Sequence, residues 1–221
     1  MKKHEYEEIE NYFINELYSN SSGHMIEKGE NSIILTAPHS ASQVREGSPK
    51  TGEYRTGLIV KKLREITNCH IAYKTINNND DANYDKVCIF KTDVASYIKE
   101  HNIKLALDFH LAKPEREFSI DIGTGHGVNI HGRDDIVKLL VKKLSLSYKD
   151  VRTDDTFAGT YPYTVSATLS RMLLIPAIQI EINWNIVSDY DKTEKLIYNF
   201  AKIIKCLEDS IWTDGLYITE H

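Results

Sequence analysis

Two histidines stand at the ends of apolar runs that are typical of buried strands. The first run, residues 33–38, leads to His39, and the second, residues 103–109, leads to His110. A third run, residues 176–183, contains Glu181. In open α/β sheets, catalytic groups gather outside the carboxyl ends of the strands, so we expect these three side chains to converge on one crevice. Two imidazoles beside carboxylates at such a rim are typical of a zinc site in a hydrolase.

The local sequence favours metal binding by both histidines. Pro38 cannot donate to a strand ladder, so the strand stops there and His39 is directed into the loop beyond it. In the second strand, alternation places Asp108 and His110 on the same side. Ligating histidines usually donate their other ring nitrogen to a carboxylate, so we expect Asp108 to orient an imidazole or to bind the metal itself.

A catalytic zinc with an open coordination position needs a third protein ligand. Glu53 stands fourteen residues beyond His39, where a glycine-containing loop ends and a helix is expected to begin. Because a helix start fixes a side chain better than a loop does, we predict that Glu53 is this ligand. Glu46, seven residues beyond His39, is the alternative.

Glu181 is the predicted general base. Strict alternation in its strand puts Gln179, Glu181 and Asn183 on one face and apolar residues on the other. A carboxylate on such a strand must meet water, a metal or a cation. As a base, Glu181 would take a proton from the attacking water and return it to the leaving amine.

Strand-like and helix-like segments alternate along the whole chain, which predicts an α/β layer fold. The 221 residues contain no repeat or linker, so we expect one domain over residues 1–221. We expect helices at residues 6–17, 53–66, 93–101, 134–146, 164–172 and 192–207, strands at residues 32–37, 70–76, 103–109 and 177–182, and a strand, turn and strand within residues 118–130.

Six short motifs in this chain resemble the N-formylglutamate amidohydrolase family. The plan of that family is in turn similar to that of the zinc carboxypeptidases and the aspartoacylase-like deacylases. The ordered set carries the resemblance, which covers roughly residues 33–185. The motifs are TAPHS at residues 36–40, KTGE at 50–53, DDAN at 80–83, DFH at 108–110, DIGT at 121–124 and QIEIN at 179–183.

The resemblance implies a three-layer α/β/α fold around a mixed central sheet. It implies one zinc ion held by His39, His110 and an acidic residue, with Glu181 as the base. It also implies hydrolysis of an amide whose amine part is an amino acid, and we expect Asp81 and Asn83 of the DDAN motif to contact that substrate.

The chain also departs from the family pattern at three positions. Ala41 stands where the family usually has glycine, Glu53 where it usually has aspartate, and Tyr84 where it has an arginine after the Asp-x-Asn motif. The hydrolase plan is compatible with these changes, but N-formylglutamate as the substrate does not follow.

A substrate carboxylate in this chemistry calls for a bidentate cation. We nominate Arg171, which stands ten residues before Glu181 and follows the segment 157–166 that resembles the family's substrate-side loop. Arg116 is the second nominee, and Arg55 and Arg133 are the remaining candidates.

The glycines at 123, 125 and 127 are weak evidence for a phosphate site, because the segment has neither the Walker lysine nor the GxGxxG spacing. His126 and His131 lie in or near this segment and are additional candidate metal ligands.

Composition places limits on partners and location. A formal net charge of −5 argues against a surface that binds nucleic acid. No window approaches the ~18 apolar residues of a membrane span, and no apolar stretch follows Lys2 and Lys3, so we expect neither a membrane span nor a secretory signal. The three cysteines are widely spaced and none forms a CxxC motif, which favours free thiols in a reducing, cytoplasmic compartment.

The sequence therefore predicts a zinc-dependent amidohydrolase that acts on a small N-acyl amino acid. Two alternatives are a zinc carboxypeptidase-like peptidase that acts on short peptides and a binding protein that has kept the fold and lost the chemistry. A degenerate protein of the latter kind is expected to lack one member of the set formed by His39, Glu53, His110 and Glu181.

Overall fold

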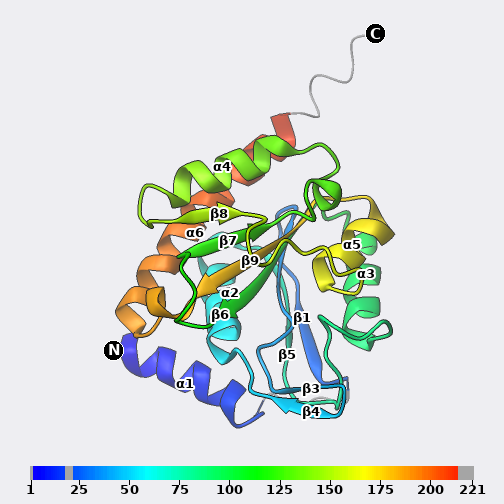
Figure 1. The fold of residues 1–221 in the computed structure, drawn as a ribbon, viewed down its shortest axis with the longest axis vertical. Coiled ribbons are helices and arrows are strands. Elements are labelled where there is room, and N and C mark those ends of the chain that lie inside the picture. Colours follow the sequence, from blue (N-terminus) through cyan, green and yellow to red (C-terminus); the bar gives the residue numbers. More distant parts are fainter. Residues whose placement is uncertain (1, 18–21, 214–221) are drawn as a thin grey trace.

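A seven-stranded mixed sheet forms the centre of the computed structural model, which describes residues 2–17 and 22–213 (Figure 1). The four strands β5, β2, β6 and β9 are parallel neighbours, whereas β1 pairs antiparallel with β5, and β7 pairs antiparallel with β9 and parallel with β8. In sheet order the strands are β1 (His24–Glu27), β5 (His70–Lys74), β2 (Ile33–Ala37), β6 (Leu105–Ala112), β9 (Ala177–Asn183), β7 (Ile120–Gly123) and β8 (Val151–Thr153).

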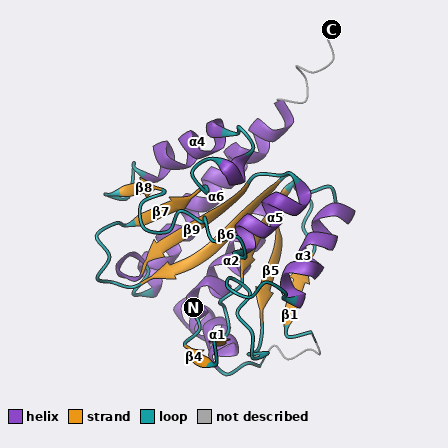
Figure 2. Cartoon of the chain, turned by 45° about the vertical axis from the view of Figure 1, so that its right-hand side comes forward, coloured by secondary structure: helices purple, strands orange, loops and turns teal. Residues whose placement is uncertain are grey.

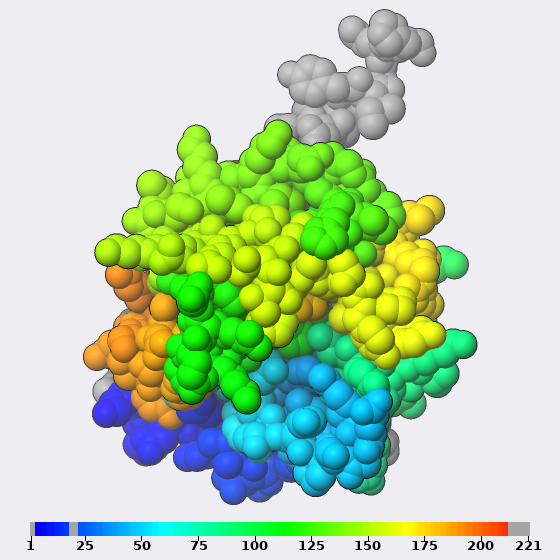
Figure 3. Space-filling view, viewed as in Figure 1, coloured from blue at the N-terminus to red at the C-terminus, as the bar shows by residue number. Residues whose placement is uncertain are grey.

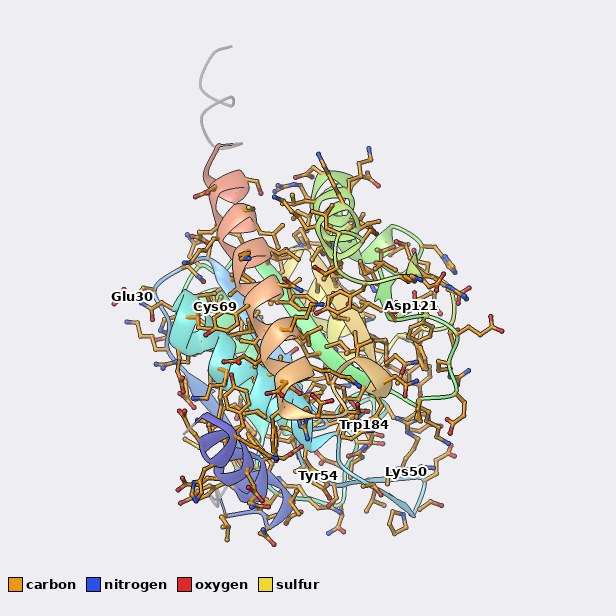
Figure 4. The ribbon with its side chains drawn as sticks, turned by 90° about the vertical axis from the view of Figure 1, so that its left-hand side faces the viewer. Glu30, Lys50, Tyr54, Cys69, Asp121 and Trp184 are labelled. Carbon is orange, nitrogen blue, oxygen red and sulfur yellow. The ribbon has the colours of Figure 1, made fainter. Side chains whose placement is uncertain are left out.

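Helices cover both faces of this sheet. One face is covered by α1 (Lys2–Ile14), α2 (Tyr54–Thr67) and α6 (Tyr190–Thr213), which lie toward the viewer in Figure 4. Helix α4 (Asp134–Leu144) packs against α6. The opposite face carries α3 (Ile89–Glu100) and α5 (Val165–Leu173), which pack against each other (Figure 2). The predicted α/β fold with helices on both sides of a mixed sheet is thus confirmed.

The central strands are apolar along most of their length because neither face of the sheet meets water. Alternate residues of β2 enter separate cores: Leu35 packs in the core beneath α2 and α6, and Ile34 in the core beneath α3 and α5. In β6, Leu107 and Phe109 face the first core. Asp108 and His110 therefore project toward the face of α3 and α5, at the carboxyl end of the strand.

The strand order reverses at β2 and β6. From β2 the chain crosses through α2 to β5 on one side, and it then returns through α3 to β6 on the other side of β2. Crevices at such a switch point, outside the carboxyl ends of the strands, are where open α/β sheets bind ligands. His39 follows β2 and His110 lies near the end of β6, so both histidines stand at this switch point.

Several elements differ from the expectations drawn from the sequence. Strands β1 and β8 and the hairpin of β3 (Gln43–Arg45) and β4 (Ser48–Lys50) were not expected, because each is only three or four residues long and is not fully buried. The second strand expected within residues 118–130 is wrong: that segment forms a turn with positive φ at residues 125–127 and the short 3-10 helix η1 (Val128–Ile130). The other expected elements are present with shifted ends.

Within residues 2–17 and 22–213, no helix is long and apolar enough to cross a membrane. The three cysteines are free thiols: Cys69 and Cys88 are buried and Cys206 is half-buried.

Candidate metal and catalytic site

His39, Glu53 and His110 meet at the carboxyl end of β2 and β6. One ligand atom from each lies within 4.8 Å of the other two. In the described part of the chain, these three residues are the one group of His, Cys, Asp or Glu side chains placed so that it could hold a metal ion (the metal-type group). The Glu53 carboxylate bridges the two rings: Oε1 lies 3.0 Å from His39 Nδ1, and Oε2 lies 3.3 Å from His110 Nδ1. The structure therefore brings together the three residues that the sequence nominated as ligands.

The outward nitrogen of each ring meets a buried aspartate. His39 Nε2 lies 2.9 Å from Oδ1 of Asp81, and His110 Nε2 lies 3.1 Å from Oδ2 of Asp108. Thr36 donates to the other oxygen of Asp108 at 2.6 Å. Each imidazole is thus held with Nδ1 toward Glu53 and Nε2 toward an aspartate, the arrangement by which carboxylates fix the orientation of ligating histidines.

Glu53 reaches this position through its backbone. It is the residue before α2, its N–H donates to the carbonyl of His39 at 2.6 Å, and its own carbonyl accepts from the backbone N–H of Thr56. The N–H of Leu111 donates to Glu53 Oε2 at 2.9 Å. The alternative, Glu46, is exposed in the β3–β4 turn and accepts from the hydroxyl of Tyr84, so it does not face the histidines.

The charges within this group shift its pKa values strongly. Burial lowers the pKa of His39, but the Glu53 charge and hydrogen bonds to Asp81 and Glu53 outweigh burial and raise it to about 9. Burial likewise lowers the pKa of His110, yet the charges of Asp108 and Glu53 hold it well above its usual value. Burial raises the pKa of Glu53, and the two histidines more than reverse this, so the carboxyl stays ionised.

The donor set fits a divalent metal ion. Two imidazole nitrogens and one carboxylate converge on one spot, the outward nitrogens of both rings are already bound to carboxylates, and both histidines are buried. Three protein ligands of the types His, His and Glu leave a coordination position open for substrate or water. His39, Glu53 and His110 are therefore the residues that would hold such an ion.

Glu181 lies beside this group on the neighbouring strand. In the β6–β9 ladder, Glu181 pairs in register with His110, and Gln179 with Asp108. Burial raises the pKa of Glu181, the positive charge of His110 lowers it in part, and the net result is a pKa of about 7. A carboxyl group with this pKa exchanges protons readily near neutral pH, which suits a general acid and base.

These groups open into a cavity of about 770 Å³. Figure 3 shows a hollow where the β3–β4 region, the segment after β6 and the loop after β8 meet, in light blue, green and yellow. The cavity is lined by the site residues His39, Glu53, His110 and Glu181, by the cationic residues Arg45, Lys50, Lys113 and Arg116, and by a polar and aromatic wall that includes Gln43, Asn83, Tyr84, Gln179 and residues 156–161.

The cations of this wall are poorly neutralised. Within the described residues, Lys50, Lys113 and Arg116 form no ion pair, and Arg45 uses only Nε, at 2.8 Å, to bind Asp81. The carboxylates that line the same cavity are those of Glu53 and Glu181. The wall thus presents an excess of positive charge in a chain whose net charge is −5. Sequence reasoning missed Arg45 and Lys50 because they lie on the unexpected hairpin.

Two of the predicted substrate contacts are displaced. Asp81 is fully buried and binds His39 and Arg45, so it lies behind the metal-type group and not in the substrate space. Arg171 is exposed, donates to the carbonyl of Pro162 at 2.9 Å and does not line the cavity. Arg171 lies near the C-terminus of α5, outside the cavity.

Two further predicted contacts, Asn83 and Arg116, do line the cavity. Asn83 Oδ1 accepts from the N–H of Val165 at 2.7 Å. The Arg116 guanidinium lies over the Phe157 ring, 5.3 Å from the centre of that ring. Arg55 is buried in an ion pair with Glu10, and Arg133 is paired with Asp135, so neither of these candidates faces the cavity.

The loop that closes the cavity is fastened to β7. The fully buried carboxylate of Asp121 accepts backbone N–H groups from Asp155, Thr156 and Phe157 at 3.2, 2.8 and 2.8 Å. Figure 4 labels Asp121 on the strand. The DIGT motif thus begins with a residue that anchors this loop, and Asp121 pairs in register with Glu181 on β9.

The glycine segment does not form a phosphate site. The carboxylate of Asp154 occupies the turn, where it accepts from the N–H and the hydroxyl of Thr124. A phosphate there would meet this negative charge. His126 lies 3.9 Å from Asp154 and His131 binds the Ser170 hydroxyl at 2.8 Å, so both stand apart from the metal-type group.

The mixed α/β fold of this chain is shared with structures of amidohydrolases, amidases and carboxypeptidases. A structure of N-formylglutamate amidohydrolase from Ralstonia eutropha JMP134 matches with a TM-score of 0.61 at 11% identity, covering 87% of this chain and 99% of that one. A bacteriophage poly-gamma-glutamate hydrolase matches with a TM-score of 0.52 at 16% identity, covering 88% and 92%.

A metallo-carboxypeptidase from Pseudomonas aeruginosa matches with a TM-score of 0.53 at 9% identity, covering 83% of this chain but only 58% of that one. No family model matches the sequence, and no curated protein matches it. At these identities the likeness establishes the fold.

Proposed function

We propose that this protein is a zinc-dependent hydrolase that cleaves the amide bond of a small N-acyl amino acid. The observation that carries the proposal is the pair of buried imidazoles that face one carboxylate, Glu53, within 4.8 Å and are each held from behind by an aspartate. A structural ion-pair network needs no such convergence of three donors beside an open cavity. The amidohydrolase, hydrolase and carboxypeptidase names of the similar structures support the same class.

Zinc held by His39, Glu53 and His110 would supply Lewis acidity, which polarises a carbonyl and lowers the pKa of a water molecule. Glu181 is the proton carrier of the proposal. Its pKa of about 7 lets it take a proton from the attacking water and deliver that proton to the leaving nitrogen. Asp81 and Asp108 keep the two imidazoles from rotating.

The cavity wall fits an anionic substrate. Arg116 presents a guanidinium without an ionic partner in the described residues, above the Phe157 ring. We assign to it the carboxylate contact that the sequence had placed at Arg171, with Asn83 as a neutral neighbour in the same wall. The substrate is a free small molecule in this proposal, and no nucleic acid or membrane partner is part of it.

A peptidase that acts on short peptides is the second candidate. The cavity volume of about 770 Å³ favours it, because that space exceeds what a single N-acyl amino acid fills. A binding protein without activity is disfavoured by the presence of the full set of His39, Glu53, His110 and Glu181 in one place.

Two measurements test the proposal. Metal analysis of the purified protein should find close to one zinc ion per chain. A screen of formyl, acetyl and succinyl amino acids beside short peptides should then find hydrolysis that a chelator abolishes and added zinc restores. A protein that takes up no zinc at this site, or a zinc-loaded protein that hydrolyses none of these compounds, contradicts the proposal.

A further inference from the structure

Two buried amide oxygens in the cavity wall have no hydrogen-bond donor among the described residues. They are Oε1 of Gln43, on β3, and Oε1 of Gln179, on β9. The two residues are 5% and 4% exposed, and both line the cavity. A buried acceptor without a donor is costly, so an open acceptor in a cavity wall is a position where a donor from a bound ligand can be accommodated.

Gln179 differs from Gln43 in that the other end of its amide is fixed. Gln179 Nε2 donates to Oε1 of Glu181 at 2.9 Å. An ionised carboxylate accepts from the NH₂ group and repels the amide oxygen, so this contact with ionised Glu181 places the Gln179 oxygen at the other end of the amide. Gln179 Oε1 is consequently turned away from Glu181, toward Gly159 of the loop that closes the cavity, where a Cβ built on Gly159 would lie 3.8 Å from it.

The position of Glu181 indicates which donor this oxygen meets. In the proposed reaction, Glu181 returns a proton to the leaving nitrogen, so that nitrogen must come within hydrogen-bond reach of its carboxylate. Gln179 is hydrogen-bonded to the same carboxylate and lies on the same face of β9. An N–H on the leaving nitrogen therefore arrives beside the open acceptor.

We propose that Gln179 is a specificity residue, whose Oε1 accepts a hydrogen bond from the N–H of the scissile amide while its NH₂ group holds Glu181. This inference rests on the proposed function and narrows the substrate class to secondary amides. Esters, and amides whose nitrogen carries no hydrogen, leave the Gln179 oxygen unpaired in the wall. Sites that hydrogen-bond an N–H discriminate against analogues that lack it, because the buried partner loses its bond.

The test compares an amide with its ester counterpart in wild type and Gln179→Met. The amide is the N-acyl amino acid that the screen finds to be hydrolysed fastest, and the ester joins the same acyl group to the corresponding 2-hydroxy acid, as N-acetylglutamate and 2-acetoxyglutarate do. Methionine keeps the size of glutamine and removes both polar ends. Since one neutral hydrogen bond contributes about a factor of ten, kcat/KM for the amide should fall about tenfold further than kcat/KM for the ester.

A second variant separates the two functions of the side chain. Gln179→Glu keeps an oxygen acceptor and loses the N–H donor to Glu181, so it should slow both substrates while it keeps more of the wild-type preference for the amide. Thr168→Val is the matched control, because the Thr168 hydroxyl is also buried and without a donor or acceptor partner in the described residues, yet lies outside the cavity. This control should leave the amide-to-ester ratio unchanged.

The outcomes distinguish the inference from the proposed function. If Gln179→Met slows both substrates equally, or changes neither, the N–H contact is wrong while the hydrolase proposal stands. If Gln179→Met does not fold, the Gln179→Glu ratio decides: a ratio equal to that of wild type supports the contact, and a complete loss of amide preference overturns it. If zinc-loaded wild type hydrolyses neither compound of any pair, the proposed function fails and this inference fails with it.

Discussion

His39 Nε2 lies 2.9 Å from Oδ1 of Asp81, although the two residues are 42 positions apart in the chain. The carboxylate of Asp81 is fully buried, and its second oxygen accepts from Arg45 at 2.8 Å. Burial raises the pKa of Asp81, but His39 and Arg45 lower it to about 2 overall. Asp81 is therefore charged at any pH near neutral and holds the His39 ring in one rotation.

Replacing Asp81 with asparagine should weaken metal binding without abolishing it. Carboxylates that orient ligating histidines typically contribute about 10–100-fold in metal affinity, so we expect a loss of that size for Asp81→Asn and for Asp108→Asn. The zinc dissociation constant, measured by competition with a chelator, checks this. Asp80→Asn is a matched control, because Asp80 pairs with Lys74 and does not contact a histidine. An equal loss in the control would mean that loop stability, and not imidazole orientation, is being measured.

Glu181→Gln should separate chemistry from metal binding. The variant keeps the size of the side chain and loses the proton-carrying group, so kcat should fall by about 10²–10⁴ with the zinc content nearly unchanged. His110→Ala removes one of the three nitrogen and oxygen donors and should lose the ion itself. Zinc content by elemental analysis and kcat on the same preparations check both. Equal zinc loss in the two variants would make Glu181 a ligand.

Zinc affinity should rise with pH because protons compete for the histidines. The pKa of His39 is raised to about 9 in the metal-free protein, and that of His110 is also raised. Each protonated ring must release a proton to bind the ion, so the affinity should increase by at least about tenfold per pH unit between about pH 6 and pH 8. Chelator competition at a series of pH values measures this slope.

The stability of the metal-free protein should move in the opposite direction with pH. A histidine whose folded pKa lies above its unfolded value stabilises the fold fully below about pH 6.5, and this contribution is lost as pH rises through the folded pKa, here about 9 for His39. Urea unfolding of metal-free protein should therefore show lower stability at pH 9 than at pH 7. His39→Gln should reduce this difference, and an unchanged difference would contradict the role of His39.

The strand ends of the site could be predicted from the sequence because the relevant signals are local. An apolar run followed by Pro38 and His39, and the alternation of Asp108 with His110, are read within a few residues. Glu53 could be reached through the helix that begins beside it. To predict that these residues lie together, one needs only the rule that the carboxyl ends of parallel strands meet at one edge of the sheet.

The remaining contacts depend on how distant segments pack, and no local pattern reports that. The DDAN motif would look the same whether Asp81 contacted the substrate or a histidine. Only the fold shows that Asp81 binds His39 and does not face the substrate. Arg45 enters the cavity because the β3–β4 hairpin folds over the site, and its strands are too short to stand out from a loop. Arg171, near the end of α5, binds the Pro162 carbonyl outside the cavity, and its distance in sequence from Glu181 does not reveal this.

Arg55 should be essential to stability rather than to substrate binding. Its guanidinium, 6% exposed, binds both oxygens of Glu10 at 2.6 and 2.9 Å and the carbonyl of Val187 at 2.7 Å, which ties α1 to α2 and to the segment before α6. Breaking a buried pair leaves an uncompensated charge, so Arg55→Met should cost about 3–5 kcal/mol. Arg152→Met, at an exposed pair with Asp155, should cost far less, because water screens exposed ion pairs. Urea unfolding of both variants decides.

We expect Arg116 to contribute to substrate binding and Arg171 not to. Arg116 lines the cavity without an ionic partner in the described residues, whereas Arg171 binds a backbone carbonyl outside it. Arg116→Ala should therefore raise KM for carboxylate-bearing substrates by about tenfold with little change in kcat, because a contact equal in ground and transition states affects binding alone. The same change should leave KM for the corresponding carboxamides almost unaffected, and Arg171→Ala should change neither. A rise in KM that is confined to Arg171→Ala would restore the original nomination and move the carboxylate site out of this cavity.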